Sequence, residues 1–194
     1  RVGVYAAGLS LTEAGIAGNA ELLDHTDMII SASGGERDIA VDTAILTGMR
    51  KAQHPGAFLN EHLMSDLRPT LFLAQLPNML AGNISLVHGV VGASRTFLGE
   101  EAAGLDAVRI AQARIATGQS VMALVGGAYH GARWDALINI ELSGILLKPP
   151  FAPVWDRGPK GGVALATMAA FLVLESRDHA RARARDRRPS RHTR

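Results

Sequence analysis

The residues best placed to do chemistry lie between positions 92 and 108, where Glu100 and Glu101 separate an apolar run from a helical pattern. Two carboxylates can act as general acid and base. Adjacent residues on a turn point apart, however, and nothing else in the chain suggests a sugar site with its set carboxylate spacing. Both acids also suit a helix start, where negative charge gains a few tenths to about 1 kcal/mol from the dipole. The segment 92–108 as a whole predicts a buried strand, a sharp elbow and a helix that opens on the small residues 102–104, whose first N–H groups point at the elbow.

Strands and helices alternate around this segment. Apolar runs bounded by glycine or turn residues predict strands, and apolar residues three or four apart predict helices. The predicted strands are 2–6, 28–33, 84–91, 95–98, 120–125 and 163–175. The predicted helices are 10–23 with a capping box of Ser10 and Glu13, 38–51, 70–80, and 102–117 ending at Gly118. This alternation predicts an α/β fold with a largely parallel sheet flanked by helices on both faces.

The composition is that of one globular domain. The 194 residues are 47% hydrophobic and 20% charged, and there is no cysteine. A chain without cysteine forms no thioester, disulfide or thiolate metal site, and it suits a reducing cytoplasm, which is the expected location. The longest apolar stretch, 162–174, is about two-thirds of a bilayer span, and no leader peptide is visible, so no membrane association is expected. The seven histidines lack metal-ligand spacing, and neither metal nor cofactor is predicted.

The net charge of +2 conceals a basic C-terminal end. Residues 176–194 contain eight arginines and two aspartates, a net +6, so residues 1–175 carry −4. Arginine clusters can bind nucleic acid by releasing counterions from phosphate. Here Arg181 and Arg183 alternate with alanines, no aromatic residues are interleaved, and Pro189 ends any helix. A solvated, poorly ordered tail at 176–194, after one domain at 1–175, is therefore favoured over nucleic-acid binding.

The segment from Gly92 resembles the active-site segment of the β-ketoacyl-acyl carrier protein synthases, the condensing enzymes of fatty-acid and polyketide synthesis. In that family a glycine is followed nine residues later by the nucleophilic cysteine, two small residues, a glycine and a helix. Counting from Gly92 without a gap places the cysteine position at Glu101, followed by the small residues 102–104. The spacing from the glycine to the small residues is intact, but glutamate replaces the nucleophilic cysteine.

Further stretches occur in the family's order. The family's Asn-x-x-Ala-Gly is matched at 78–82, its strand and Gly-Gly-Ala turn at 125–128, and its midpoint strand and helix at 171–183. Two departures accompany them: Tyr129 stands at an acidic position, and 166–169 replace a Gly-acid-Gly-Ala turn. The family's second half, with its pair of histidines and its Phe-Gly turn, has no counterpart here. The resemblance implies the N-terminal, thiolase-like half of a family subunit.

The resemblance also implies roles for particular residues. Glu101 occupies the position of the nucleophile and of an oxyanion-type backbone donor. Some members carry glutamine there and act as chain-length partners or decarboxylating subunits. A carboxylate cannot replace the thiolate, because an acyl anhydride is far higher in energy than a thioester, and it would repel the enolate formed on decarboxylation. We therefore expect a family chain, a partner or truncated subunit, that does not condense by itself.

The resemblance finally implies an interface and partners. Family subunits pair across a two-fold axis through the strand before the nucleophile, which predicts a homo- or heterodimer interface at Ser94, Arg95, Thr96, Phe97 and Leu98. The implied partners are an acyl carrier protein or a catalytic ketosynthase homologue. Two alternatives stay open: a small α/β binding protein with no connection to a carrier protein, and a nucleic-acid binder that uses the basic tail.

Overall fold

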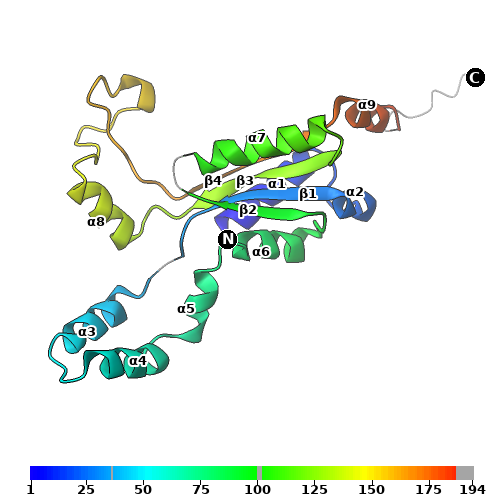
Figure 1. The fold of residues 1–194 in the computed structure, drawn as a ribbon. Helices are drawn as coiled ribbons and strands as arrows, with labels where there is room; N and C mark the ends of the chain where they lie inside the picture. Colours follow the sequence, from blue (N-terminus) through cyan, green and yellow to red (C-terminus); the bar gives the residue numbers. More distant parts are fainter. Residues whose placement is uncertain (36, 100–101, 187–194) are drawn as a thin grey trace, which may run out of the picture. The chain divides into compact units, whose positions relative to one another are not determined.

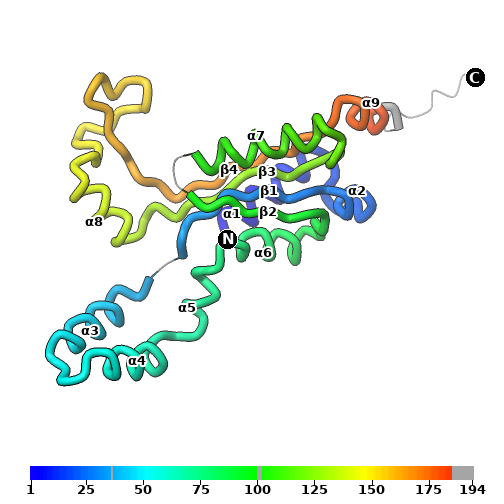
Figure 2. The backbone as a smooth tube through the Cα atoms, in the orientation of Figure 1, coloured from blue at the N-terminus to red at the C-terminus, as the bar shows by residue number. Residues whose placement is uncertain are grey.

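The computed structural model describes residues 1–35, 37–99 and 102–186, which form two compact units. The sheet unit comprises Arg1–Ser33, Pro77–Ala128 and the chain from Ala169 onward. The helical unit comprises Gly34–Leu76 and Tyr129–Met168. The chain thus leaves the sheet unit twice and returns twice, as the tube in Figure 2 traces.

The sheet unit is built on four strands in the order β2-β1-β3-β4 (Figure 1). Their bounds are β1 Thr26–Ala32, β2 Ser94–Leu98, β3 Met122–Tyr129 and β4 Met168–Glu175. Strand β1 pairs in parallel with both β2 and β3, with Ile30 opposite Thr96 and Gly126. Strand β4 is antiparallel to β3, because Ser176 N donates to Val121 O while Gly126 packs on Phe171. The predicted parallel-rich α/β sheet is confirmed.

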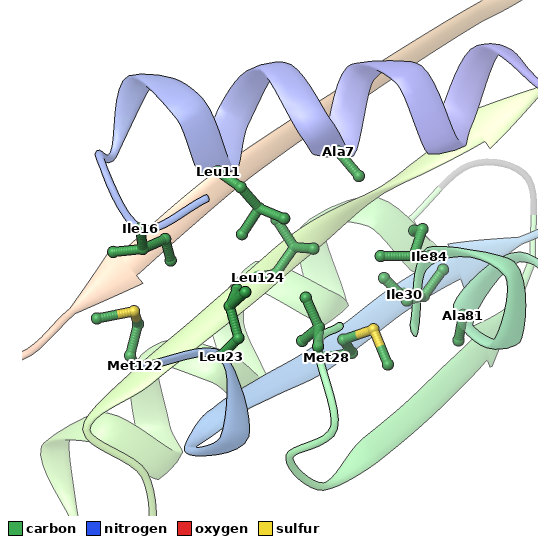
Figure 3. Packing of buried hydrophobic residues seen from close by; sticks show 11 residues of the cluster. Ala7, Leu11, Ile16, Leu23, Met28, Ile30, Ala81, Ile84, Met122 and Leu124 are labelled. Atoms are coloured by element: carbon green, nitrogen blue, oxygen red, sulfur yellow. The ribbon is translucent and has the colours of Figure 1, made fainter. Parts of the chain in front are cut away.

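Helices cover both faces of this sheet. Side chains alternate along each strand, so Met28 and Ile30 face α1 (Val2–Glu13) and α6 (Met79–His88), whereas Ile29 faces α7 (Ala103–Ala116). Figure 3 shows the first of these cores, with Leu11 of α1 over Leu124 of β3. Each fully buried Leu or Ile contributes about 1.5–3 kcal/mol, so packing on both faces holds the layers together.

Shorter helices complete the chain, and local signals explain several of their ends. In α3 (Ile39–Met49) the Asp38 carboxylate accepts from Val41 N at 3.3 Å, which is an N-cap. Helix α7 is followed by Gly118 at φ +72°, as the sequence predicts. The remaining helices are α2 Ala20–Asp24, α4 Pro55–Ser65, α5 Pro69–Ala74, α8 Trp134–Leu142, the 3₁₀ turn Val154–Asp156 and α9 Arg177–Asp186. Within the described residues, no helix combines the length and the apolar character that a membrane crossing requires.

Two strand predictions are wrong. Residues 2–6 begin α1, and 84–88 of the run 84–91 belong to α6. Short apolar runs fit a buried strand or a buried helix equally well, and here the buried Gly3, Ala7 and Leu11 share one helical face.

Helix boundaries in this part of the chain also differ from the predictions. The predicted helix 10–23 is divided between the end of α1 and α2, with Gly15 and Gly18 at positive φ between them. The predicted capping box is likewise wrong, because Ser10 lies in the last turn of α1, where its hydroxyl donates to Phe171 O at 2.9 Å.

Candidate functional site

The candidate site is the connection between β2 and α7. Strand β2 ends at Leu98 and α7 begins at Ala103, so the four positions between them join a strand to a helix, as predicted. Gly99 has φ +150°, and a Cβ there would lie 3.2 Å from the Ala103 Cβ, so this position favours glycine. Glu100 and Glu101 lie outside the described residues, and both roles expected of Glu101 stay predictions.

Helix α7 lies close to the sheet because its inner face is made of small residues. Ala103, Ala107 and Ala111 are buried at four-residue spacing and pack with Ile29 of β1 and with β3. Methyl side chains let the helix axis approach the strands. The N-terminus of α7 is thereby fixed at the carboxyl end of β2, and the side chain of its N-cap residue, Ala102, makes no capping hydrogen bond. The first N–H groups of a helix can donate to an anion or a developing oxyanion.

An ion pair anchors the opposite end of α7. Arg114 Nε and Nη2 donate to Asp27 Oδ2 at 3.2 and 2.9 Å, and Ala93 N donates to Asp27 Oδ1 at 3.0 Å. Only 16% of the arginine side chain and 11% of the aspartate side chain are exposed. Asp27 therefore connects β1, the chain entering β2, and α7. Sequence reasoning missed this pair, although a charged residue at the head of an apolar strand was the available signal.

Gly92, the glycine on which the family count begins, has a structural reason to be glycine. A Cβ at this position would collide with the backbone carbonyl of Thr26, where the chain enters β2 beside β1. The neighbouring cavity of about 500 Å³ is lined by Gly92, His25, Asp27 and Ser120, among others. It lies where β1, β2 and β3 begin, at the end of the sheet opposite the β2–α7 connection.

The residues predicted for the interface lie together on an edge strand. Strand β2 is the last strand on its side of the described sheet, and β1 is its neighbour (Figure 1). Ser94, Arg95 and Leu98 are exposed, and Leu98 is 65% accessible. Thr96 and Phe97 are half-buried, and Phe97 packs against the α7 core. An edge strand has unpaired backbone groups available for another chain.

Part of the predicted basic tail is a helix. In α9, His179 Nδ1 and Arg183 Nε contact Glu175 Oε1 at 2.6 and 2.8 Å, and Arg183 also donates to Ala14 O. The hydrogen bond from Arg183 holds the pKa of Glu175 below its ordinary value, against the opposing effect of burial. Residues 177–186 of the expected poorly ordered tail therefore form a helix, and residues 187–194 are not among those that the structure describes. In the part of the chain that is described, no three His, Asp or Glu side chains gather as metal ligands would.

A parallel-rich sheet between helices, with a strand-to-helix connection at the end of its edge strand, is an arrangement that this chain shares with thiolase-like β-ketoacyl synthases. The β-ketoacyl synthase N-terminal domain model matches residues 9–180, and the chain belongs to this family. The expected resemblance is thereby confirmed.

Individual relatives agree with the family assignment. The chain is 26% identical over 175 residues to 3-oxoacyl-[acyl-carrier-protein] synthase 2 of Vibrio harveyi. The aligned region covers 87% of this chain and 42% of that protein. Among solved structures, a β-ketoacyl synthase from Burkholderia phymatum STM815 matches with a TM-score of 0.68 and 24% identity, over 93% of this chain and 42% of that one. The ishigamide ketosynthase/chain length factor matches with a TM-score of 0.59 and 20% identity, over 93% and 43%. The chain thus spans less than half the length of these relatives.

Proposed function

We propose that this chain is a non-condensing ketosynthase-family subunit that works beside a catalytic ketosynthase on intermediates held by an acyl carrier protein. The observation that carries the proposal is the residue at the nucleophile position. The family frame from Gly92 places Glu101 there, between β2 and α7, and the whole chain contains no cysteine.

The chemistry of a carboxylate at this position supports the proposal. A thiolate attacks a carrier thioester to give another thioester of similar energy, so acyl transfer proceeds readily. A glutamate would give a mixed anhydride, which is much higher in energy and hydrolyses. A carboxylate beside the N-terminus of α7 would also compete for the N–H donors that an oxyanion needs.

The exposed edge of the sheet supports a role in a complex. Strand β2 offers an edge of backbone donors and acceptors, and Leu98 adds apolar surface that association would bury. One structural neighbour is a ketosynthase/chain length factor, and another is an acyl carrier protein in complex with its ketosynthase. We infer that Ser94–Leu98 forms the contact with a second ketosynthase-family chain, either a copy or a catalytic homologue.

The test combines a turnover assay with a placed cysteine. The purified chain, incubated with acyl and malonyl carrier-protein thioesters, is expected to give no condensation product by mass spectrometry. Glu101→Cys is expected to become acylated by the acyl thioester, because a helix N-terminus lowers a thiol pKa, but still not to condense. Glu100→Cys is the matched control, with the same thiol one residue away, and should be acylated far more slowly.

Two results would contradict the proposal. Condensation by the unsubstituted chain would show that Glu101 or another group replaces the thiolate. Equal acylation of the two cysteine variants would show that position 101 is not at the elbow. A chain that associates with neither a carrier protein nor a ketosynthase would instead favour a non-catalytic α/β binding protein with no connection to an acyl carrier protein.

A further inference from the structure

The helical unit contains a cavity of about 310 Å³ that is lined by three arginines, among other residues. Arg37 precedes α3, Arg68 precedes α5 and Arg133 precedes α8, so three stretches of chain bring guanidinium groups to one place. The rest of the lining is Asp38, Ile39, Leu71, Ala132, Trp134 and Asp135. Each of the three arginines has an aspartate partner: Asp38 and Asp135 belong to the lining, and Asp42 pairs with Arg37.

The three guanidinium groups differ in how firmly they are held. Arg133 is 14% exposed and is fixed by Asp135 and by Gly34 O, to which Nη1 donates at 2.6 Å. Arg37 and Arg68 are 63% and 68% exposed, and among the described residues they form ion pairs with Asp42 at 2.7 Å and with Asp38 at 3.4 Å, respectively. Exposed ion pairs contribute little to stability. Arg37 and Arg68 can therefore exchange a carboxylate oxygen for an oxygen of a ligand, while Arg133 stays in place.

An exposed indole lies in the same lining. Trp134, the first residue of α8, is 72% exposed. An indole presents a flat apolar face on which a planar ring or a guanidinium group can stack. The cavity therefore offers two kinds of contact, charge-assisted hydrogen bonds from the arginines and stacking from Trp134.

We propose that this cavity binds a phosphate monoester that carries a planar ring. Guanidinium forks match phosphate oxygens in pairs, which favours phosphate over a single carboxylate. The volume is at the small end of ligand pockets, about 300–1,000 Å³. The inference is independent of the proposed function, because every lining residue belongs to the helical unit.

Tryptophan fluorescence tests the site directly. The chain has two tryptophans, and Trp155 is 94% exposed, so Trp155→Phe leaves Trp134 as the reporter in a folded background. Titration with phenyl phosphate is expected to quench Trp134 in a saturable manner, inorganic phosphate should compete, and phenol should not bind. Arg68→Gln should weaken binding about tenfold or more, the effect of losing a hydrogen bond to a charged group. Arg109→Gln, which removes a 71% exposed arginine of α7, is the matched control and should leave the affinity unchanged.

Several outcomes would overturn the proposal. They are the absence of saturable quenching at millimolar phenyl phosphate, equal binding by Arg68→Gln and the parent, and equal quenching by phenol. Equilibrium dialysis of phenyl phosphate against the unsubstituted chain repeats the measurement without the Trp155 change. Failure to bind there also refutes the site, and thermal melting of each variant shows whether lost binding reflects lost folding.

Discussion

The ion pair between Asp27 and Arg114 gives the sharpest prediction, because it connects β1, the entry to β2 and the last turn of α7. We expect Asp27→Asn, which keeps the shape and removes the charge, to destabilise the fold. Removing one partner of a buried ion pair lowers the free energy of unfolding by about 3–5 kcal/mol. Because the two side chains here are still 11% and 16% exposed, we expect a loss of about 2–4 kcal/mol. The arginine keeps a contact with Gln119 Oε1, but that amide does not neutralise it.

Urea denaturation followed by circular dichroism measures the loss as a shift of the midpoint. A double-mutant cycle with Arg114→Met separates the pair from the single side chains. The double variant should be less destabilised than the sum of the single variants, by about 1–3 kcal/mol of coupling. Asp106→Asn is the matched control, because Asp106 lies on the same helix in an exposed pair with Arg109, with 46% and 71% exposure. It should cost less than about 1 kcal/mol.

The reasoning is refuted if Asp27→Asn costs no more than Asp106→Asn, or if the effects of the two single substitutions simply add. Either result would mean that water already screens the pair. The position of α7 would then depend on the packing of its alanine face and not on the anchor at its end.

Three further predictions address the core, the C-terminal helix and the edge strand. Leu124→Ala should cost about 2–5 kcal/mol in urea unfolding, because Leu124 is fully buried, whereas Leu172→Ala, at a 54% exposed position, should cost less than about 0.5 kcal/mol; equal effects would contradict the core assignment. The folded state lowers the pKa of Glu175. The ionised carboxylate therefore stabilises the fold above its ordinary pKa of 4.5, and this stabilisation is lost as the pH falls through the lowered pKa of the folded state. Glu175→Gln should therefore be less stable at neutral pH and flatten the acid limb of a stability–pH profile; an unchanged limb would contradict this. Leu98→Lys should weaken association measured by sedimentation, and Leu172→Lys on the other edge strand should not; equal effects would count against β2 as the interface.

The sequence by itself determined the features that depend on local pattern and spacing. Helix α7 was predicted within one residue at each end, because its apolar period, small first turn and terminal Gly118 are local signals. Strand β1 followed from an apolar run closed by a glycine pair, and the α/β class followed from the alternation of elements. The spacing from Gly92 to 101–104 carried the family assignment, which the match over residues 9–180 confirms.

The tertiary structure alone decided what depends on which surface an element buries. The runs 2–6 and 84–91 are apolar in either conformation, and they are largely helical because α1 and α6 cover one face of the sheet. Arg114 finds Asp27 across 87 positions, which no periodicity reports. Arg183 of α9 likewise donates to Ala14 O across 169 positions. Local propensity acts over a few residues, whereas the partner that satisfies a charge or covers an apolar face is fixed only when distant segments pack.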